Sequence, residues 1–351
     1  MQNAEVVIQT KQYDFLREND HLGENIILLS FSGSYAHGIA EEYADVNLLG
    51  CAVNKPSDIL GLSVFDHYTD KETNTTVQSF FKTAMLLKAG DIITSEMLGC
   101  DRSQYAIVSP LGKQLLANKS LFFSQKTASA YYGYIKALEE FLCDAGSRLK
   151  LGRQCLEKSI LSACEKPMQK FNKVFSGNGE GDSYAKLFIA PPEKDRYEPE
   201  VFMDAEIHNC PIRNFTDLLT SLQNITEVQQ RGAAVRKLLD KHWLGKKMCT
   251  AVRLLLTCCE LLESGQVHTN REKDADLLIP IRDGKYILPN CNIDDAFFDI
   301  LNPLLQRVEY ARENTVLPPE PDNDLVNEFV MEISRKVIRR KKAAAEMPAP
   351  V

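Results

Sequence analysis

Residues 25–53 have the sequence NIILLSFSGSYAHGIAEEYADVNLLGCAV, and this stretch decides the expected fold. Residues 25–32 form a compact apolar run that stops at Gly33 and Ser34, which is typical of a buried strand ending in a turn. Residues 45–53 form a second apolar run. The pattern therefore predicts two neighbouring strands that are joined by a loop beginning at Gly33.

The residues after this stretch predict further elements. Residues 72–78 are rich in β-branched side chains and predict a third strand, which is followed by a helix that ends at Gly90. From about residue 124 the apolar spacing is almost wholly helical. The expected helices span 127–145, 153–174, 213–241, 247–264, 293–313 and 322–341.

Together these patterns predict an α+β protein of two domains. We expect a small mixed-sheet head at 1–120 and a helical domain at 121–341. Glycine, proline and charged residues make 176–211 a loop-rich insertion, and the terminal residues 342–351 are expected to be disordered.

Composition excludes several classes of protein. The 351 residues contain 41 Lys and Arg against 48 Asp and Glu, and the formal charge of −7 argues against a generally basic nucleic-acid coat. No run of eighteen apolar residues and no signal peptide is found, so we expect a cytoplasmic protein without a membrane partner. The ten cysteines form no CxxC pair, which favours reduced thiols over zinc or structural disulfides.

The turn after residue 32 has the chemistry of a phosphate site. A backbone that turns at Gly33 and Ser34 presents N–H groups and a hydroxyl, which stabilise anionic oxygens. Positions 45 and 47 of the next strand lie on one face, since side chains alternate along a strand. Acids there and on a neighbouring strand would hold two metal ions for in-line nucleotidyl transfer.

Several segments resemble the polymerase-beta-like nucleotidyltransferase superfamily, and most nearly its YcgL/RlaP-type predicted nucleotidyltransferases, which are linked to RNA repair in bacteria and large phages. LLSFSGSYAHGIAEEYADVNLLGCAV is similar to the family's GS-x-x-x-G…SDIDLRG strand pair. NTTVQSFFKTAMLLKAGDIITSEML resembles its D-x-x-x-Y-S-L-x-K-F…G-N-P-x-x-x-E-L segment. Later segments of the family resemble AVRLLLTCCELLESGQV, LLIPIRDGKY and LPPEPDNDLVNEFVMEI.

The resemblance implies a catalytic site that uses Mg²⁺, with Asp45 as the first metal acid. The second and third positions fall on Asn47 and Asn74, so two carboxylates of the family are replaced by amides. An amide oxygen can bind Mg²⁺ but carries no charge, which weakens the implied site. Glu72, two residues before Asn74, or an acid at 41–42 could partly replace the missing carboxylates.

The resemblance also implies residues that bind the nucleoside triphosphate. Gly33, Ser34 and Gly38 would form the phosphate turn, Lys82 matches the family's Lys, and Arg253 would grip a phosphate.

Other positions keep alternative interpretations. His37 is either a phosphate or leaving-group contact or a solvent-facing loop residue, and Arg282 is either a turn-stabilising residue or a phosphate contact. Tyr131 and Tyr132 are expected in the core, with base stacking as the alternative. The basic run 335–342 is either a solvated helix end or a guide for RNA phosphates.

The first functional hypothesis is a nucleotidyltransferase that moves a nucleoside monophosphate from a nucleoside triphosphate to an acceptor such as RNA. The alternative is a catalytically degenerate protein of the same fold that binds nucleotide, RNA or a protein partner without turnover, and a third option is a structural protein without ligand. A phage-borne gene would place the protein in the host cytoplasm. The sequence identifies no particular protein partner.

Overall fold

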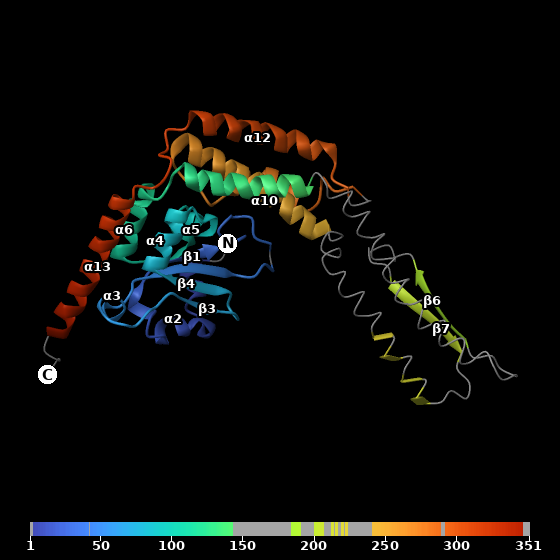
Figure 1. Ribbon diagram of the computed structural model, residues 1–351, viewed down its shortest axis with the longest axis horizontal. Helices are drawn as coiled ribbons and strands as arrows, with labels where there is room; N and C mark the ends of the chain where they lie inside the picture. The colour runs from blue at the N-terminus through green and yellow to red at the C-terminus, as the bar shows by residue number, and fades with distance from the viewer. Residues whose placement is uncertain are drawn as a thin grey trace. The chain divides into compact units, whose positions relative to one another are not determined.

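The computed structural model describes residues 3–41, 43–142, 184–190, 200–206, 241–288 and 292–346, with the short pieces 212–213, 215–216, 219–220 and 222–223. These residues confirm an α+β fold, with a mixed five-stranded sheet in the N-terminal part and a mostly helical C-terminal part (Figure 1). The chain divides into two compact units. The first contains Met1–Ala137, Cys249–Ile279 and Phe298–Val351, and the second contains Leu138–Met248 and Pro280–Phe297.

The elements of the N-terminal part follow one another closely. In chain order they are α1 (Ala4–Val7), η1 (Lys11–Tyr13), α2 (Phe15–Glu18), η2 (Gly23–Asn25), β1 (Ile26–Ser32), β2 (Asn47–Ala52), α3 (Pro56–Leu60), β3 (His67–Asp70), β4 (Thr75–Ser79), α4 (Phe80–Ala89), α5 (Ile92–Met97), η3 (Arg102–Gln104), β5 (Tyr105–Val108), α6 (Pro110–Ala117) and η4 (Lys119–Leu121).

The remaining elements are mostly long helices. After the helical residues 125–142 come β6 (Tyr184–Ala190), β7 (Glu200–Glu206), α10 (Lys241–Ser264), η5 (Glu272–Asp274), α11 (Ala275–Arg282), α12 (Asp295–Asn314) and α13 (Asn323–Glu346).

The large sheet has the strand order β3-β4-β2-β1-β5. β1 pairs antiparallel with β2, and the last pair of this ladder joins Ser32 to Asn47. β4 runs parallel to β2, and Leu48 is opposite Thr75. The end of β1, the start of β2 and the start of β4 therefore meet at one end of the sheet.

Both faces of the central strands are covered, which explains why their sequences are continuously apolar. On one face Leu29, Phe31 and Val77 join a buried cluster with Leu16 of α2. On the other face α4, α5 and α6 pack on β1 and β2 (Figure 1). The tight fit of α6 requires Gly112, where a methyl group would overlap the backbone of β1.

The third strand begins later than the sequence predicts. Residues 71–74 form the turn between β3 and β4, and β4 starts at Thr75. Two features prevent the strand from beginning earlier. Asn74 has a positive φ of 48°, and the Asp70 carboxylate accepts a hydrogen bond of 2.8 Å from the N–H of Thr73. Glu72 and Asn74 therefore lie in a turn, and the prediction that the strand begins at residue 72 is wrong.

The other early predictions have mixed outcomes. β1, β2 and α4 are confirmed, and Gly90 ends α4 in the left-handed conformation with φ 83°. The antiparallel pair β6–β7 lies inside the range 176–211, where the sequence predicts loops. The connecting residues of that range and the helix predicted at 153–174 lie outside the described residues.

In the first unit, helices form a layer beside the sheet. Tyr131, on the helix 125–142, is fully buried, so the alternative that it stacks on a base is wrong. α13 packs against α3 and α4, and Phe329 makes edge contacts with Phe80 and Phe122. α13 continues to Glu346, so part of the predicted tail is helical.

The second unit contains smaller packed groups. Trp243 packs edge-on against Phe141 with ring centroids 5.7 Å apart, so it serves as a packing residue. Arg282 ends α11 and pairs with the neighbouring Asp283, which agrees with a structural role. Of the helices that the structure describes, none combines the length and the apolar character needed to cross a membrane.

Candidate functional site

The turn that follows β1 is held open by two glycines with positive φ. Gly33 has φ 64° and Gly38 has φ 71°, a conformation that other residues adopt at a cost. Inside the turn, the N–H of His37 donates to the Gly33 carbonyl over 3.0 Å. No described residue accepts a hydrogen bond from the N–H of Ser34 or of Tyr35. The turn thus leaves backbone donors available for an anion, as the sequence predicts.

Three of the predicted metal positions lie at the end of the sheet beside this turn. The Asn47 amide nitrogen lies 3.3 Å from the position that a methyl group on Gly33 would take. The parallel register places Asn74 level with Asn47 on the neighbouring strand, since the next residues, Leu48 and Thr75, are paired. Asp45 is exposed two residues before β2. The structure therefore places Asn47 beside Gly33 and Asn74 level with Asn47, and Asp45 precedes the same strand by two residues.

The donor set at this end of the sheet fits one magnesium ion rather than two. It offers the Asp45 carboxylate and the amide oxygens of Asn47 and Asn74. Within the described ranges, no three His, Cys, Asp or Glu side chains are grouped as metal ligands. Mg²⁺ is commonly held by one or two carboxylates together with substrate phosphates, so an ion that arrives with a triphosphate suits Asp45. A pair of metals held by three protein acids does not suit these residues.

Two of the acids that could replace the missing carboxylates lie outside the strands. Glu72 is exposed in the β3–β4 turn, and Glu41 is half-buried in the loop before Asp45. Glu42 lies outside the described residues.

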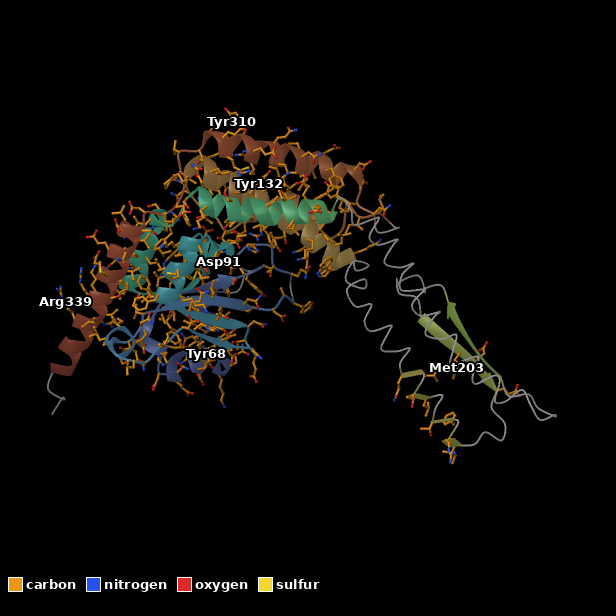
Figure 2. All side chains as sticks on the ribbon, in the orientation of Figure 1. Tyr68, Asp91, Tyr132, Met203, Tyr310 and Arg339 are labelled. Atoms are coloured by element: carbon orange, nitrogen blue, oxygen red, sulfur yellow. The ribbon has the colours of Figure 1, made fainter. Side chains whose placement is uncertain are left out.

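Gly33 also lines a cavity of about 730 Å³. Its lining residues include Ser32, Gly33 and His37, and the others come from α4, α5, the helix 125–142 and α10. Asp91, labelled in Figure 2, lies at the corner between α4 and α5 and also lines the cavity. Its carboxylate already accepts hydrogen bonds from the N–H and hydroxyl of Thr94, over 2.8 and 2.6 Å.

A buried charged cluster forms the floor of this cavity. The Arg253 guanidinium of α10 donates a short hydrogen bond to the Glu96 carboxylate of α5. The second oxygen of Glu96 lies 3.2 Å from Nε2 of His37. The side chains of His37, Glu96 and Arg253 are only 14%, 11% and 7% exposed, so water screens their charges weakly.

The cluster fixes the protonation states of its members. Burial would raise the pKa of Glu96, but the charge of Arg253 and the hydrogen bond from His37 outweigh it and lower that pKa to about 2. Burial lowers the pKa of His37, and the nearby charge of Arg253 lowers it further. At neutral pH the cluster therefore contains an ionised Glu96, a charged Arg253 and a neutral His37.

Two residues from outside the turn anchor its backbone. The Gln104 side chain donates to the carbonyl of Ala36 over 2.7 Å and to that of Tyr35 over 3.3 Å. The N–H of Arg271 donates to the carbonyl of His37 over 2.8 Å. Arg271 is itself fully buried and forms an ion pair of 2.7 Å with Glu260. The turn is therefore fixed by contacts from η3 and from the segment after α10.

The structure does not bring every predicted phosphate contact to this place. Lys82 lies in the first turn of α4, and its ammonium pairs with Asp66 over 2.6 Å. Its neighbour Ser79 ends β4, whereas Asn74 precedes that strand, so Lys82 is at the opposite end of the sheet from Gly33. Ser34 is half-buried in the turn, and Gly38 packs against Asn270 rather than lining the cavity.

Sequence reasoning gave no role to three residues of this site: Glu96, Gln104 and Arg271. Glu96 could have been identified from the sequence, because it matches the Glu of the family's G-N-P-x-x-x-E-L segment. Arg253 and Glu96 belong to two separate resembling segments, and only the fold shows that they form a pair. Gln104 and Arg271 carried no such signal, since their role is to bind backbone carbonyls far away in the sequence.

Comparison with known proteins identifies the family of this region. No curated protein and no solved structure matches the chain. Residues 5–152 match the sequence model of the family described as RlaP, RNA repair pathway DNA polymerase beta family. This match spans the sheet, the phosphate turn and Glu96. Residues 5–152 therefore form a domain of the RlaP type, of the RNA repair pathway DNA polymerase beta family.

Proposed function

We propose that this protein transfers a nucleoside monophosphate from a nucleoside triphosphate to a hydroxyl group of RNA. The observation that carries the proposal is the position of Gly33. Asn47 lies against this residue, and Gly33 also lines the cavity that contains buried Arg253. A polyphosphate at Gly33 would thus contact the Asp45 end of the sheet while its nucleoside enters the cavity.

Binding would combine backbone donors with one buried cation. The N–H groups of Ser34 and Tyr35 suit phosphate oxygens. Arg253 lines the cavity, and it uses one guanidinium nitrogen for Glu96, which leaves its other donors for the ligand. Asp45, with the Asn47 amide, would hold a magnesium ion that accompanies the triphosphate and neutralises its charge. Catalysis would then rest on alignment of the acceptor hydroxyl with the α-phosphorus.

Transfer of an α-phosphate label tests this function. The wild-type protein is incubated with RNA, Mg²⁺ and each of the four α-labelled triphosphates in turn, and we expect label on RNA with at least one. Asp45→Ala should lower the rate about 100-fold, which is the size expected when one charge-stabilising group is lost. Asp66→Ala is the matched control, because it removes an exposed carboxylate that pairs with Lys82 at the opposite end of the sheet. No transfer with any triphosphate, or equal rates for Asp45→Ala and wild type, would contradict the proposal.

A second candidate function is nucleotide binding without turnover. The observation that favours it is that two of the three metal positions, Asn47 and Asn74, carry amides. This protein would bind a triphosphate with weak dependence on Mg²⁺ and release it unchanged. Calorimetry with and without Mg²⁺, followed by chromatography of the recovered nucleotide, separates the two candidates, because any turnover excludes the second.

A further inference from the structure

His37 presents a free ring nitrogen beside the cavity. Its Nε2 lies 3.2 Å from Glu96, and an ionised carboxylate can only accept a hydrogen bond, so Nε2 carries the proton. The other nitrogen, Nδ1, then has a lone pair. No described residue forms a hydrogen bond with Nδ1, although the imidazole is 86% covered. A lone pair in such a place can accept a proton from a ligand.

The ring is held in place from several elements. Glu96 of α5 fixes Nε2, Arg253 of α10 fixes Glu96, and the N–H of Arg271 fixes the backbone carbonyl of His37. These three residues are also the charged groups that face the imidazole. Asp91 and Tyr134 are the other titratable groups that line the same cavity.

The other groups near Gly33 are poorer proton acceptors. The amides of Asn47 and Asn74 are not basic at neutral pH. Glu96 is committed to Arg253, and its pKa of about 2 makes it a weak base. Asp91 caps α5 and accepts from Thr94. His37 is left as the neutral nitrogen base that lines the cavity.

We propose that His37 is the general base of the transfer reaction, and that Glu96 and Arg253 are positioning residues that hold its tautomer. This inference rests on the proposed function and adds the residue that activates the RNA hydroxyl. The proton moves from the hydroxyl to Nδ1 as the oxygen forms a bond to the α-phosphorus of the triphosphate. The bond between the α-phosphorus and the bridging oxygen breaks, and pyrophosphate leaves with the electron pair. His37 is then a cation beside ionised Glu96, and it returns the proton to water.

The tautomer can be measured without any turnover. In protein labelled with ¹⁵N at histidine, the six histidines give separate imidazole signals, and His37→Gln identifies the signal of His37. At pH 7 we expect a neutral ring with hydrogen on Nε2. Glu96→Gln should weaken this preference. A cationic ring, or hydrogen on Nδ1, would overturn the inference.

Kinetics test the catalytic role. His37→Ala should lower the single-turnover rate about 100- to 10,000-fold, which is the range for general bases, and added imidazole should restore part of the rate. The wild-type rate should fall on acidification with a pKa below 6.5, and this limb should vanish in the variant. The matched control is His67→Gln, because His67 also pairs with a carboxylate, Asp66, over 2.8 Å, but it is exposed on β3. The control should transfer at the wild-type rate.

The outcomes separate this inference from the proposed function. If the wild-type protein transfers label and His37→Ala transfers it at a rate within threefold, His37 is not the general base, and the proposed function stands. If wild type transfers no label, the proposed function fails and the base fails with it. If His37→Ala loses its fold, as shown by thermal unfolding, His37→Gln takes its place, since its amide can still donate to Glu96. Loss of rate in His37→Gln with unchanged triphosphate affinity supports the base, and an unchanged rate overturns it.

Discussion

The Arg253 guanidinium on α10 binds the Glu96 carboxylate on α5, so that a buried ion pair joins residues 157 positions apart. The pair connects the helix that packs on the sheet with the helical layer above it. The same carboxylate lies 3.2 Å from Nε2 of His37, which belongs to the turn after β1. One contact therefore links the packing of the first unit to the geometry of its candidate site.

The first prediction concerns the stability that this pair provides. Glu96→Gln should lower the free energy of unfolding by about 3 kcal/mol, because it leaves the Arg253 charge buried without a counterion. Glu263→Gln breaks another Arg–Glu pair, which has two hydrogen bonds to Arg307, but the partners are about half-exposed, and the change should cost less than about 1 kcal/mol. Urea denaturation of both variants checks this. Equal losses would show that burial of the first pair has no energetic consequence.

The second prediction concerns pH. The folded state lowers the pKa of His37 below its ordinary value of 6.5, so the unfolded chain takes up a proton more readily. Stability should therefore fall as the pH drops below 6.5, by at most about 1.4 kcal/mol per pH unit for this one group. The slope should be smaller in His37→Gln. Unfolding in urea between pH 5 and 8 measures both curves, and parallel curves would contradict the prediction.

Glu96 should act in a different pH window. Its folded pKa of about 2 lies below the ordinary value of 4.5, so its contribution is complete above pH 4.5 and is lost as the pH falls towards 2. The His37 measurement between pH 5 and 8 is thus free of this effect.

The third prediction concerns the turn itself. Gly38→Ala should destabilise the protein by about 2 kcal/mol or more, because Gly38 has a positive φ and a methyl group would overlap the Asn270 side chain. Gly133→Ala is the matched control, since Gly133 is an exposed helical residue with open space around it. It should be neutral or stabilise by up to about 1 kcal/mol. Thermal unfolding measures both, and a harmless Gly38→Ala would show that the turn tolerates other backbone conformations.

The fourth prediction concerns the missing acids. The double variant Asn47→Asp, Asn74→Asp should tighten Mg²⁺ binding about tenfold or more in the presence of a non-hydrolysable triphosphate, because carboxylates attract Mg²⁺ more strongly than amides do. Asp tolerates the positive φ of position 74, so the fold should persist. Calorimetric titration checks this, with Asn3→Asp as a control that adds a negative charge at the N-cap of α1, outside the predicted metal positions. An unchanged affinity would mean that these positions do not face the bound ion.

The fifth prediction concerns RNA binding by α13. Arg335, Arg339 and Arg340 are exposed on this helix, and Figure 2 labels Arg339 near its end. If they contact RNA phosphates, Arg339→Glu with Arg340→Glu should weaken RNA binding equally for all sequences and make its salt dependence shallower. Fluorescence anisotropy at several salt concentrations tests this. Lys336→Ala is the control, because Lys336 already pairs with Gln114 and Glu332 and should matter less. Unchanged RNA affinity would show that these arginines do not bind RNA and only make the end of the helix soluble in water.

The sequence was sufficient for the central strands and the turn between them. The apolar runs of β1 and β2 and the glycine after the first one are local signals, because burial on both faces demands continuous apolar sequence. The sequence did not predict the start of β4, because the residues there have only a weak local pattern and contacts with other residues decide the structure. β4 begins at Thr75 because the Asp70 carboxylate and the left-handed Asn74 form a hairpin turn, and β-branched residues alone do not reveal that turn.

By itself, the amino-acid sequence determined the glycine turn after β1 and the presence of Asp45, Asn47 and Asn74 where the resemblance expects three acids, since these are matters of residue type and short spacing. Only the tertiary structure decided which distant side chains meet them. In the folded protein Lys82 pairs with Asp66 at the other end of the sheet, and Glu96 pairs with Arg253 and contacts His37. The physical reason is that buried charges must find partners in space, and the packing of helices on the sheet selects those partners.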